Sequence, residues 1–229
     1  GDKTGPLVNY IFHNKVVTPN KSIQLLFLKW WDEVKKYKVA IGYTDDEMDR
    51  LTDGDNLLGN FATDIIKNVS GADIAILNSG GFRTNWYPGD ILLEDVYNMF
   101  PFENKLTTWE MTGSEIKEMI SIIQTGKMAL YPTSGLAIKM KKNPYQVESI
   151  KFYNGNEIID DKVYTVGGLD FEIPFGGDDF RKVIDWYSPR NLKYYGLWRD
   201  EVINYIKCIK RIRKEDYYDP NHKRIEFIQ

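Results

Sequence analysis

Apolar residues recur at intervals of three and four positions in four segments of the chain, and this spacing predicts four amphipathic helices. The first helix begins at Ser22, whose hydroxyl suits an N-cap, and we expect its apolar stripe to belong to the core. The stripe consists of Ile23, Leu26, Phe27, Trp30, Trp31 and Val34. Asp55 is the expected cap of the second helix, and Thr112 and Glu115 form a capping box ahead of the third. The last helix is expected at roughly 198–212.

Short runs rich in β-branched and aromatic residues predict the strands. These runs lie at 39–43, 74–77, 136–140, 147–153, 163–166 and 224–228. Asn154-Gly155 is typical of a tight hairpin turn, so we expect the three runs between 136 and 166 to form a meander. Because helices and antiparallel strands are mixed without regular βαβ alternation, the predicted class is α+β. No repeat or low-complexity block divides the 229 residues, which favours a single domain.

Composition and charge narrow the classes of function. No apolar run approaches the ~18 residues that would span a bilayer, so no membrane-spanning segment is expected. The formal net charge is -3, from 30 basic and 33 acidic residues, so the chain lacks the overall excess of basic residues that is typical of DNA-binding proteins. Cys208 is the single cysteine, and the two histidines, His13 and His222, lie near opposite ends. This inventory disfavours a zinc cluster, a transition-metal centre and a Ser-His-Asp hydrolase.

The segment ILNSGGFRTNWYPGD, residues 76–90, is the first candidate for binding chemistry. A predicted buried strand runs here into consecutive glycines, where backbone N–H groups are exposed and a ligand can approach closely. Asn78 offers a donor and acceptor pair for a base or sugar edge, Gly81 belongs to the glycine pair, and Arg83 offers a planar fork for phosphate or carboxylate. A sharp turn with an exposed arginine is the alternative.

Two further segments place aromatic residues beside turns. In FEIPFGGDDF, residues 171–180, aromatic side chains could stack on a planar base while a carboxylate of the turn accepts hydrogen bonds from ribose hydroxyls. Buried packing of these phenylalanines is the alternative. Phe100-Pro101-Phe102 is ambiguous in the same way.

Seven spaced motifs occur along the chain. They are Asn56 to Phe61, Asn78 to Arg83, Phe100 to Glu103, Met111 to Ile116, Val163 to Val166, Asp170 to Asp179 and Arg224 to Phe227. In this order they resemble the N-L-G-N-L, N-G-G-G-I-R, L-P-F-G, L-x-G-x-E, V-Y-x-V, N-F-x-A-x-G-G-D-G and R-I-K-F motifs of the C-terminal domain of the 5'-nucleotidase family, which includes UDP-sugar hydrolases. Several motifs in the right order are far rarer by chance than one alone, and the resemblance covers roughly residues 38–228.

The resemblance implies a fold and a set of binding residues. The implied fold is a layered α/β/β/α sandwich of mixed, largely antiparallel sheet with flanking helices, formed here by residues 21–229. In the family this domain binds the nucleoside part of the substrate, and the base lies between two phenylalanines, which by position are Phe102 and Phe171. The motif residues Asn78, Arg83 and Asp178 would contact base, phosphate and ribose, respectively. A further family arginine, just before the first motif, looks like Arg50.

The resemblance also implies what this chain lacks. Family members carry, ahead of this domain, a metallophosphatase half whose two divalent metal ions activate water and stabilise in-line displacement. Nothing before Asn20 resembles that half, so residues 1–20 would be a remnant of the hinge or linker. We therefore expect the substrate-binding part of a 5'-nucleotidase-type phosphohydrolase, with no catalytic residue and no cofactor of its own. It would be covalently linked to the metal half in the full-length protein and located outside the cytoplasm.

Departures from the family motifs keep other functions open. Ser79 and Phe82 replace the usual glycine and isoleucine, and Asp179 stands where glycine is common. A scaffold or interaction domain that has lost nucleotide binding is the first alternative. A basic stripe on the last helix could contact nucleic acid, although such stripes are usually solvated exterior. It consists of Lys207, Lys210, Arg211 and Lys214. The acidic loop 45–55 lacks the ligand spacing of an EF-hand and is interpreted as solvated.

Overall fold

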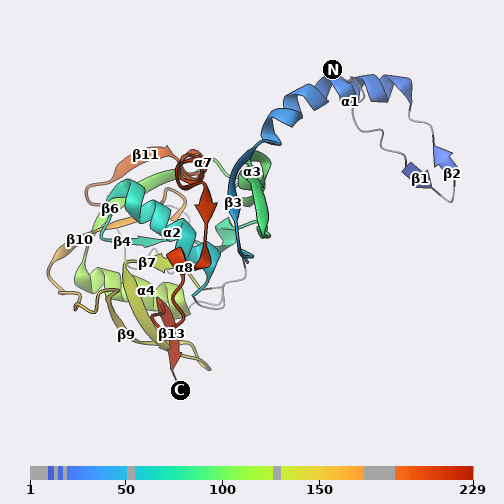
Figure 1. Cartoon of the computed structure of the whole chain (residues 1–229). Coiled ribbons are helices and arrows are strands. Elements are labelled where there is room, and N and C mark those ends of the chain that lie inside the picture. The colour runs from blue at the N-terminus through green and yellow to red at the C-terminus, as the bar shows by residue number, and fades with distance from the viewer. Residues whose placement is uncertain are drawn as a thin grey trace.

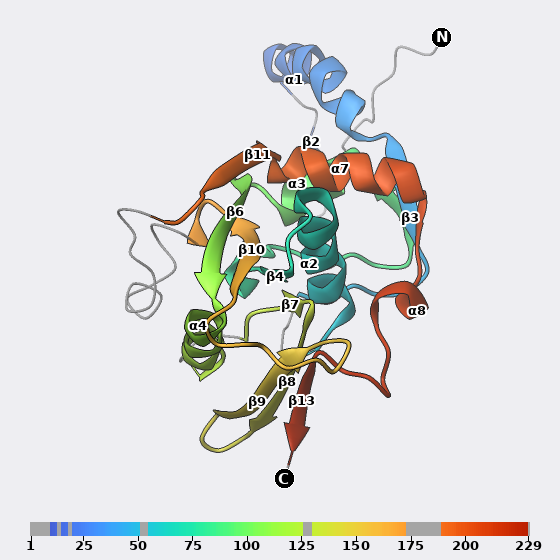
Figure 2. The same cartoon turned by 90° about the vertical axis from the view of Figure 1, so that its left-hand side faces the viewer.

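The computed structural model describes residues 10–12, 15–17, 20–50, 55–125, 130–172 and 189–228. A five-stranded sheet lies at its centre (Figure 2). In order across the sheet, its strands are β11 (Lys193–Leu197), β6 (Lys105–Thr112), β10 (Val163–Leu169), β4 (Ile74–Ile76) and β7 (Thr133–Ser134). β4 is parallel to β10, whereas the other neighbours in this sheet are antiparallel.

Two three-stranded sheets and a short ribbon complete the described strands. One sheet consists of β12 (Arg211–Ile212), β3 (Ala40–Thr44) and β5 (Gly89–Leu92), and the other of β13 (Ile225–Ile228), β8 (Leu136–Lys141) and β9 (Gln146–Phe152). The ribbon pairs β1 (Tyr10–Phe12) with β2 (Lys15–Val17). The pairing is mixed and largely antiparallel, which confirms the predicted α+β class.

Helices cover both faces of the central sheet (Figures 1 and 2). The helical elements are α1 (Lys21–Val34), η1 (Lys35–Tyr37), α2 (Leu57–Ser70), η2 (Ser79–Gly81), α3 (Leu93–Met99), α4 (Gly113–Thr125), α7 (Trp198–Ile209) and α8 (Lys214–Tyr217). α2, α3 and α7 enclose one hydrophobic cluster, together with β3 and β5. α4, β8 and β13 enclose a second cluster on the other face.

The central strands separate these two clusters because successive side chains point to opposite faces. In β4, Ile74 and Ile76 belong to the second cluster, whereas Ala75 between them belongs to the first. In β10, Gly168 allows Trp109 of β6 to lie close to the backbone, since a Cβ atom there would lie 2.8 Å from the indole Cη2. The inner strands β4, β6 and β10 are therefore largely buried on both faces.

One of the three predicted helix caps is confirmed and two are corrected. The Thr112–Glu115 capping box is confirmed: Thr112 N donates to Glu115 Oε2 at 2.7 Å and Glu115 N donates to Thr112 Oγ1 at 3.3 Å. The predicted cap of the first helix is wrong, because Asn20 rather than Ser22 is the N-cap. The predicted cap of the second helix is displaced by one residue. Asn56 rather than Asp55 is the N-cap, and its side-chain oxygen accepts a hydrogen bond from Gly59 N at 2.7 Å. Asp55 instead accepts a hydrogen bond from Arg224 N.

The predicted meander is also wrong. β8 and β9 form an antiparallel pair, but β10 leaves that sheet and pairs with β6 and β4 in the central one. The Asn154-Gly155 turn closes only the isolated bridge between Lys151 and Glu157. β10 carries buried residues on both faces, and such a strand is stable only with cover on both sides.

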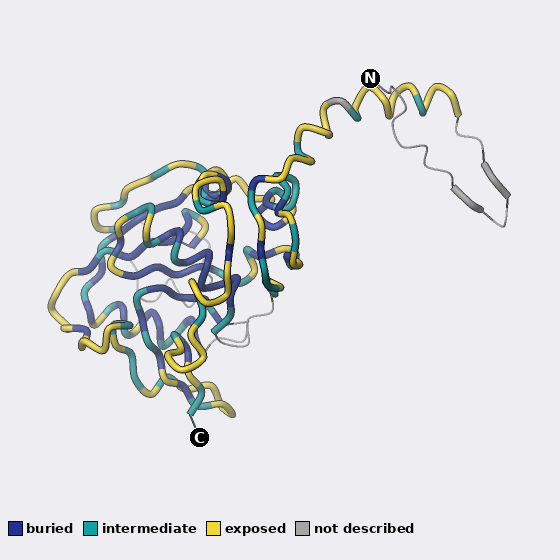
Figure 3. The backbone as a smooth tube through the Cα atoms, in the orientation of Figure 1, coloured by how far each residue is buried: buried dark blue, intermediate teal, exposed yellow. Residues whose placement is uncertain are grey.

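The apolar stripe of α1 is exposed, which contradicts the prediction that it belongs to the core. Figures 1 and 3 show α1 projecting from the body of the domain with an almost entirely exposed surface. Ile23 is 66% and Trp30 is 60% exposed, and neither belongs to the two clusters. Phe27 and Trp31 stack on each other, with ring centroids 5.7 Å apart. The periodicity identified the helix correctly, but periodicity carries no information on what the apolar face packs against.

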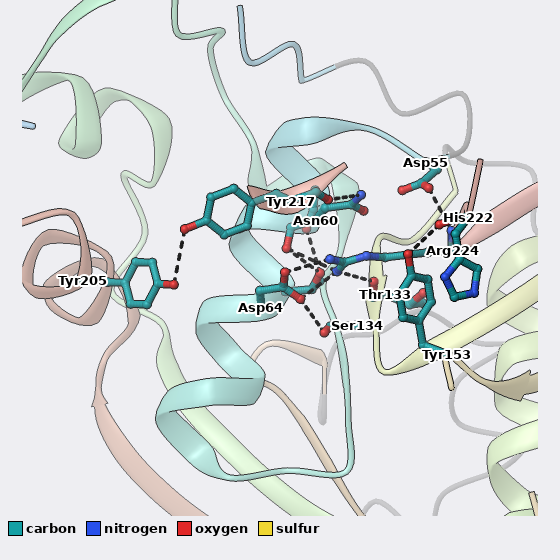
Figure 4. Close-up of polar contacts among 12 residues, drawn as sticks. Asp55, Asn60, Asp64, Thr133, Ser134, Tyr153, Tyr205, Tyr217, His222 and Arg224 are labelled. Carbon is teal, nitrogen blue, oxygen red and sulfur yellow. Dashed lines mark hydrogen bonds and ion pairs between the residues drawn. The ribbon is translucent and has the colours of Figure 1, made fainter. Parts of the chain in front are cut away.

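A polar network attaches the last strand to α2 (Figure 4). The guanidinium of Arg224 makes a bidentate ion pair with Asp64, with both N–O distances at 2.7 Å, and the two side chains are 11% and 20% exposed. Ser134 Oγ donates to Asp64 Oδ1, and the Tyr153 ring lies 5.8 Å from the guanidinium carbon. The closing motif of the sequence thus has a structural role.

Replacing Arg224 with Met should destabilise the fold by about 3 kcal/mol, because Asp64 would be left largely buried without its cation. Urea denaturation gives the free energy of unfolding. Lys139→Met is the matched control, since Lys139 makes a surface pair with Glu226 at 3.5 Å that is about half exposed on both sides. That variant should change stability by less than about 0.5 kcal/mol. Equal effects of the two substitutions would contradict the structural role of Arg224.

Candidate functional site

A cavity of about 300 Å³ lies at one edge of the central sheet. We call it the slot. Its lining comes from the end of β4 and η2, the segment between α3 and β6, and the end of β10. These residues are Leu77, Asn78, Gly80, Gly81, Arg83, Phe102, Asn104, Leu169, Phe171 and Glu172. The three segments that the sequence singled out separately therefore meet around one cavity.

Strand pairing explains why these segments meet. β4 and β10 are parallel, with Ile74 opposite Val166, so both strands end at the same edge of the sheet. β6 is antiparallel to β10, with Leu106 opposite Leu169, so β6 begins where β10 ends. The chain that leaves β4, leaves β10 and enters β6 must consequently occupy the same place.

Phe102 and Phe171 are half exposed, at 50% and 39%, and both line the slot. Phe100 differs, because it is buried and packs edge-on against Trp198 at a centroid distance of 5.5 Å. The ambiguity of the Phe100-Pro101-Phe102 segment is thus resolved into one core residue and one slot residue. Large aromatic side chains that stay exposed around a cavity offer apolar area to a ligand.

Asn78 and Arg83 lie on the β4 side of the slot. The Asn78 carboxamide oxygen caps η2 by accepting from Gly80 N at 2.9 Å, so part of its hydrogen-bonding capacity is used within the turn. Arg83 is exposed at the rim, where Nη1 donates to Gly80 O at 3.3 Å. Its guanidinium carbon lies 5.8 Å from the Phe102 ring centroid, within the range of a cation–π contact. A planar cation therefore stands beside an exposed aromatic ring.

Gly81 also lines the slot, and the fold does not require a glycine there. Its φ angle is not in the left-handed region, and a Cβ atom would meet nothing within 4 Å. The described fold therefore leaves open space where a Cβ atom at this position would stand.

Two slot residues with polar side chains, Asn104 and Glu172, were missed by the sequence analysis. Asn104 Nδ2 donates to Asp170 Oδ1 at 3.1 Å, and the same oxygen accepts from Lys105 N at 3.1 Å. Glu172 is 1% exposed and accepts from two backbone groups, Asn78 N at 2.9 Å and Leu169 N at 2.7 Å. Asn104 directly follows the Phe100–Glu103 motif, and Glu172 is an acidic residue between two apolar ones, which were the available signals.

Burial raises the pKa of Glu172 to about 7, and the nearby Asp170 carboxylate acts in the same direction. Hydrogen bonds from the backbone of Asn78 and Leu169 oppose this effect because they favour the charged form. Glu172 also contributes to the raised pKa of Tyr131, after burial of that phenol. The floor of the slot thus contains a carboxyl group that titrates near neutral pH.

The remaining predicted site residues lie elsewhere. Arg50 is exposed, its backbone N donates to Asn85 Oδ1 at 3.1 Å, and it is not part of the described lining of the slot. Asp178 lies outside the described residues, as do most of residues 171–180. The binding roles of all these residues stay predictions.

The prediction that Lys207, Lys210, Arg211 and Lys214 share one face of the last helix is wrong, because α7 ends at Ile209 and Arg211 and Lys214 lie in β12 and α8. Arg211 of the basic stripe makes a bidentate pair with Asp45, with distances of 2.8 and 2.5 Å, and this pairing lowers the pKa of Asp45. Within the described ranges, no three His, Cys, Asp or Glu side chains are grouped to hold a metal ion. The helices found in those ranges are too short or too polar to cross a lipid bilayer.

The fold and the slot together define a mixed α+β domain with a small aromatic-lined cavity. The family model described as "5'-nucleotidase, C-terminal domain" matches residues 38–185. The trifunctional nucleotide phosphoesterase protein YfkN of Bacillus subtilis is 33% identical over 192 residues, which cover 75% of this chain and 13% of that protein. NAD 5'-nucleotidase of Haemophilus influenzae is 27% identical over 177 residues, which cover 69% of this chain and 29% of that protein.

A solved structure has the same fold. The 5'-nucleotidase precursor from Thermus thermophilus superposes with a TM-score of 0.73 and 21% identity, over 91% of this chain and 43% of that one. The chain spans less than half the length of each of these three relatives. The chain belongs to the 5'-nucleotidase family, in which it corresponds to the C-terminal domain.

The raised pKa of Glu172 predicts a pH-dependent stability. The folded pKa of about 7 lies above the ordinary 4.5, so the folded protein binds this proton more tightly than the unfolded chain does. The resulting stabilisation is full below pH 4.5 and is lost as the pH rises through 7. We expect up to about 3 kcal/mol of unfolding free energy to be lost on this account between about pH 5 and about pH 8.

Glu172→Gln cannot titrate and should lack this component. Urea denaturation of both proteins at the two pH values isolates it, because all other titrating groups are shared. The same pH dependence in both proteins would refute the assignment to Glu172.

Proposed function

We propose that this chain binds the nucleoside part of a nucleotide as the substrate-binding domain of a 5'-nucleotidase-type phosphohydrolase. The observation that carries the proposal is the pair of half-exposed rings, Phe102 and Phe171, which come from distant segments and line one cavity. A planar base would stack on these rings, an interaction worth about 1–3 kcal/mol per base that tolerates different bases. The volume of about 300 Å³ lies at the lower end for small-molecule sites.

The polar residues of the slot would orient the ligand. The carboxamides of Asn78 and Asn104 would meet the edge of the base, and Gly81 would allow the close approach. Arg83, at the rim beside Phe102, would hold phosphate oxygens by charge-assisted hydrogen bonds. The family resemblance adds Asp178 for the ribose hydroxyls and Arg50 as a further contact, and both assignments are part of the proposal.

The proposal gives this chain no hydrolytic step of its own. Two divalent metal ions in a covalently linked metallophosphatase half would supply the activated water, and the domain described here would position the phosphoryl group for attack. Residues 1–20 would belong to the hinge between the two parts, and residues 21–229 would form the binding domain. The names of the two curated relatives, a nucleotide phosphoesterase and a NAD 5'-nucleotidase, support a nucleotide substrate. Location outside the cytoplasm is included on the family resemblance alone.

Removing either slot ring should weaken adenosine binding by about tenfold or more, since each substitution removes one stacking face. Isothermal calorimetry on Phe102→Ala and Phe171→Ala gives the dissociation constants. Tyr145→Ala is the matched control, because Tyr145 is also 39% exposed but lies in the turn between β8 and β9. Adenosine binding that is undetectable in the unaltered chain would instead favour a scaffold or interaction domain.

Arg83→Ala should separate phosphate binding from base binding. We expect about tenfold weaker AMP binding with adenosine affinity changed less than about twofold, since the guanidinium meets only the charged part of the ligand. Gly81→Ala tests the close approach, because a Cβ atom there meets nothing within 4 Å in the fold but would meet a closely bound ligand. That variant should keep its unfolding free energy and lose affinity for both ligands. Unchanged binding in both variants would remove the β4 side of the slot from the proposed site.

A further inference from the structure

Glu172 is an unusual residue in this molecule. Among the described residues it is the only buried acidic or basic side chain, and none of the lysines, arginines or histidines described forms an ion pair with it. A buried carboxylate without a cation is costly, and a fold retains one only where other donors satisfy it. The donors here are backbone N–H groups.

The two carboxylate oxygens hold two different walls of the slot. Oε1 accepts from Asn78 N, at the start of the turn that carries Gly81 and Arg83. Oε2 accepts from Leu169 N, at the end of the strand that leads to Phe171. Phe171 directly precedes Glu172, so the position of its ring depends on where the carboxylate is anchored. One side chain therefore links the turn that follows β4 to the end of β10 across the slot.

Only the ionised carboxylate satisfies both contacts fully. A carboxylate accepts at both oxygens, whereas a neutral carboxyl group turns one oxygen into an O–H donor. That oxygen then faces a backbone N–H group, which weakens one of the two hydrogen bonds and leaves the hydroxyl proton in need of an acceptor. The described titratable groups that interact with this carboxyl group are Asp170 and Tyr131, and Arg83 is the charged residue that lines the same cavity.

We propose that Glu172 is a positioning residue that makes nucleoside binding in the slot pH-dependent, with the ionised carboxylate holding the binding conformation. The inference rests on the proposed function, because it concerns the regulation of the same slot. Glu172 would affect ligand binding indirectly, by positioning Asn78 and Phe171, and not by contact with the phosphate. By thermodynamic linkage, a ligand that binds better to the ionised form must in turn release protons when it binds.

Adenosine is the appropriate probe, because it lacks the phosphate group that would itself titrate near pH 6. Its affinity should rise about five- to tenfold between about pH 5.5 and about pH 8.5, as expected when a charge-assisted hydrogen bond is restored. Calorimetry in two buffers with different ionisation enthalpies should give a release of up to about half a proton per adenosine near neutral pH.

Glu172→Gln retains the shape and one acceptor but cannot titrate. We expect adenosine affinity independent of pH in this variant, with no proton release. Asp55→Asn is the matched control, since burial also raises the pKa of Asp55 but this residue lies outside the described lining of the slot. That variant should keep the pH profile and the proton release of the unaltered chain.

The outcomes separate this inference from the proposed function. The first outcome needs no variant. If the unaltered chain binds adenosine with a flat pH profile and no proton release, the role of Glu172 is overturned and the proposed function stands. A pH profile and proton release that persist in Glu172→Gln overturn that role equally. No adenosine binding at any pH overturns the proposed function and the inference together.

Discussion

The parallel pairing of β4 with β10 is the constraint on which the candidate site depends. The pairing of Val166 with Ile74 and of Gly167 with Ala75 brings the carboxyl ends of two strands, almost a hundred residues apart in sequence, to one edge of the sheet. β6, antiparallel to β10, enters the sheet at the same edge. Three loops that are unrelated in sequence must meet there, and each contributes to a single cavity. Ligands commonly bind beyond the carboxyl ends of strands for this geometric reason.

The slot contains two features that folding alone does not favour. Phe102 and Phe171 leave aromatic area in water, and Glu172 places a carboxylate in a site that burial makes unfavourable for charge. Exceptions of this kind are expected where a chain has been shaped by binding rather than by stability. Elsewhere in the described part of the chain, the largest buried side chains pack in two ordinary hydrophobic clusters. Phe100 and Phe102 differ in the same way, because Phe100 is buried in the core and Phe102 is half exposed at the slot.

The family of this chain and the chemistry of its slot rest on different observations. The match over residues 38–185 shows the family, and the solved structure of 21% identity shows the fold. The slot geometry belongs to this chain, including Glu172, which stands at an unspecified position of the Asp170 to Asp179 motif. Because the chain spans less than half of each relative compared, the activity of the whole protein depends on more than this domain.

Local pattern by itself determined the four longest helices, six of the thirteen described strands and the segments that form the slot. The Thr112–Glu115 capping box and the helical periodicity of α1, α2, α4 and α7 involve residues within a few positions of one another, so a sequence window contains all the information needed. The ordered motifs likewise identified Asn78, Gly81, Arg83, Phe102 and Phe171 as candidates before any of them was placed around the cavity.

Tertiary structure alone decided which neighbours these elements have. It separated β9 from β10, left the stripe of α1 exposed, assigned Phe100 to the core, and buried Glu172 between Asn78 and Leu169. Each of these outcomes depends on contacts between residues far apart in sequence. Amphipathic spacing predicts which side chains of a helix share one face. What packs against that face is set by strand pairing and by packing across the whole chain.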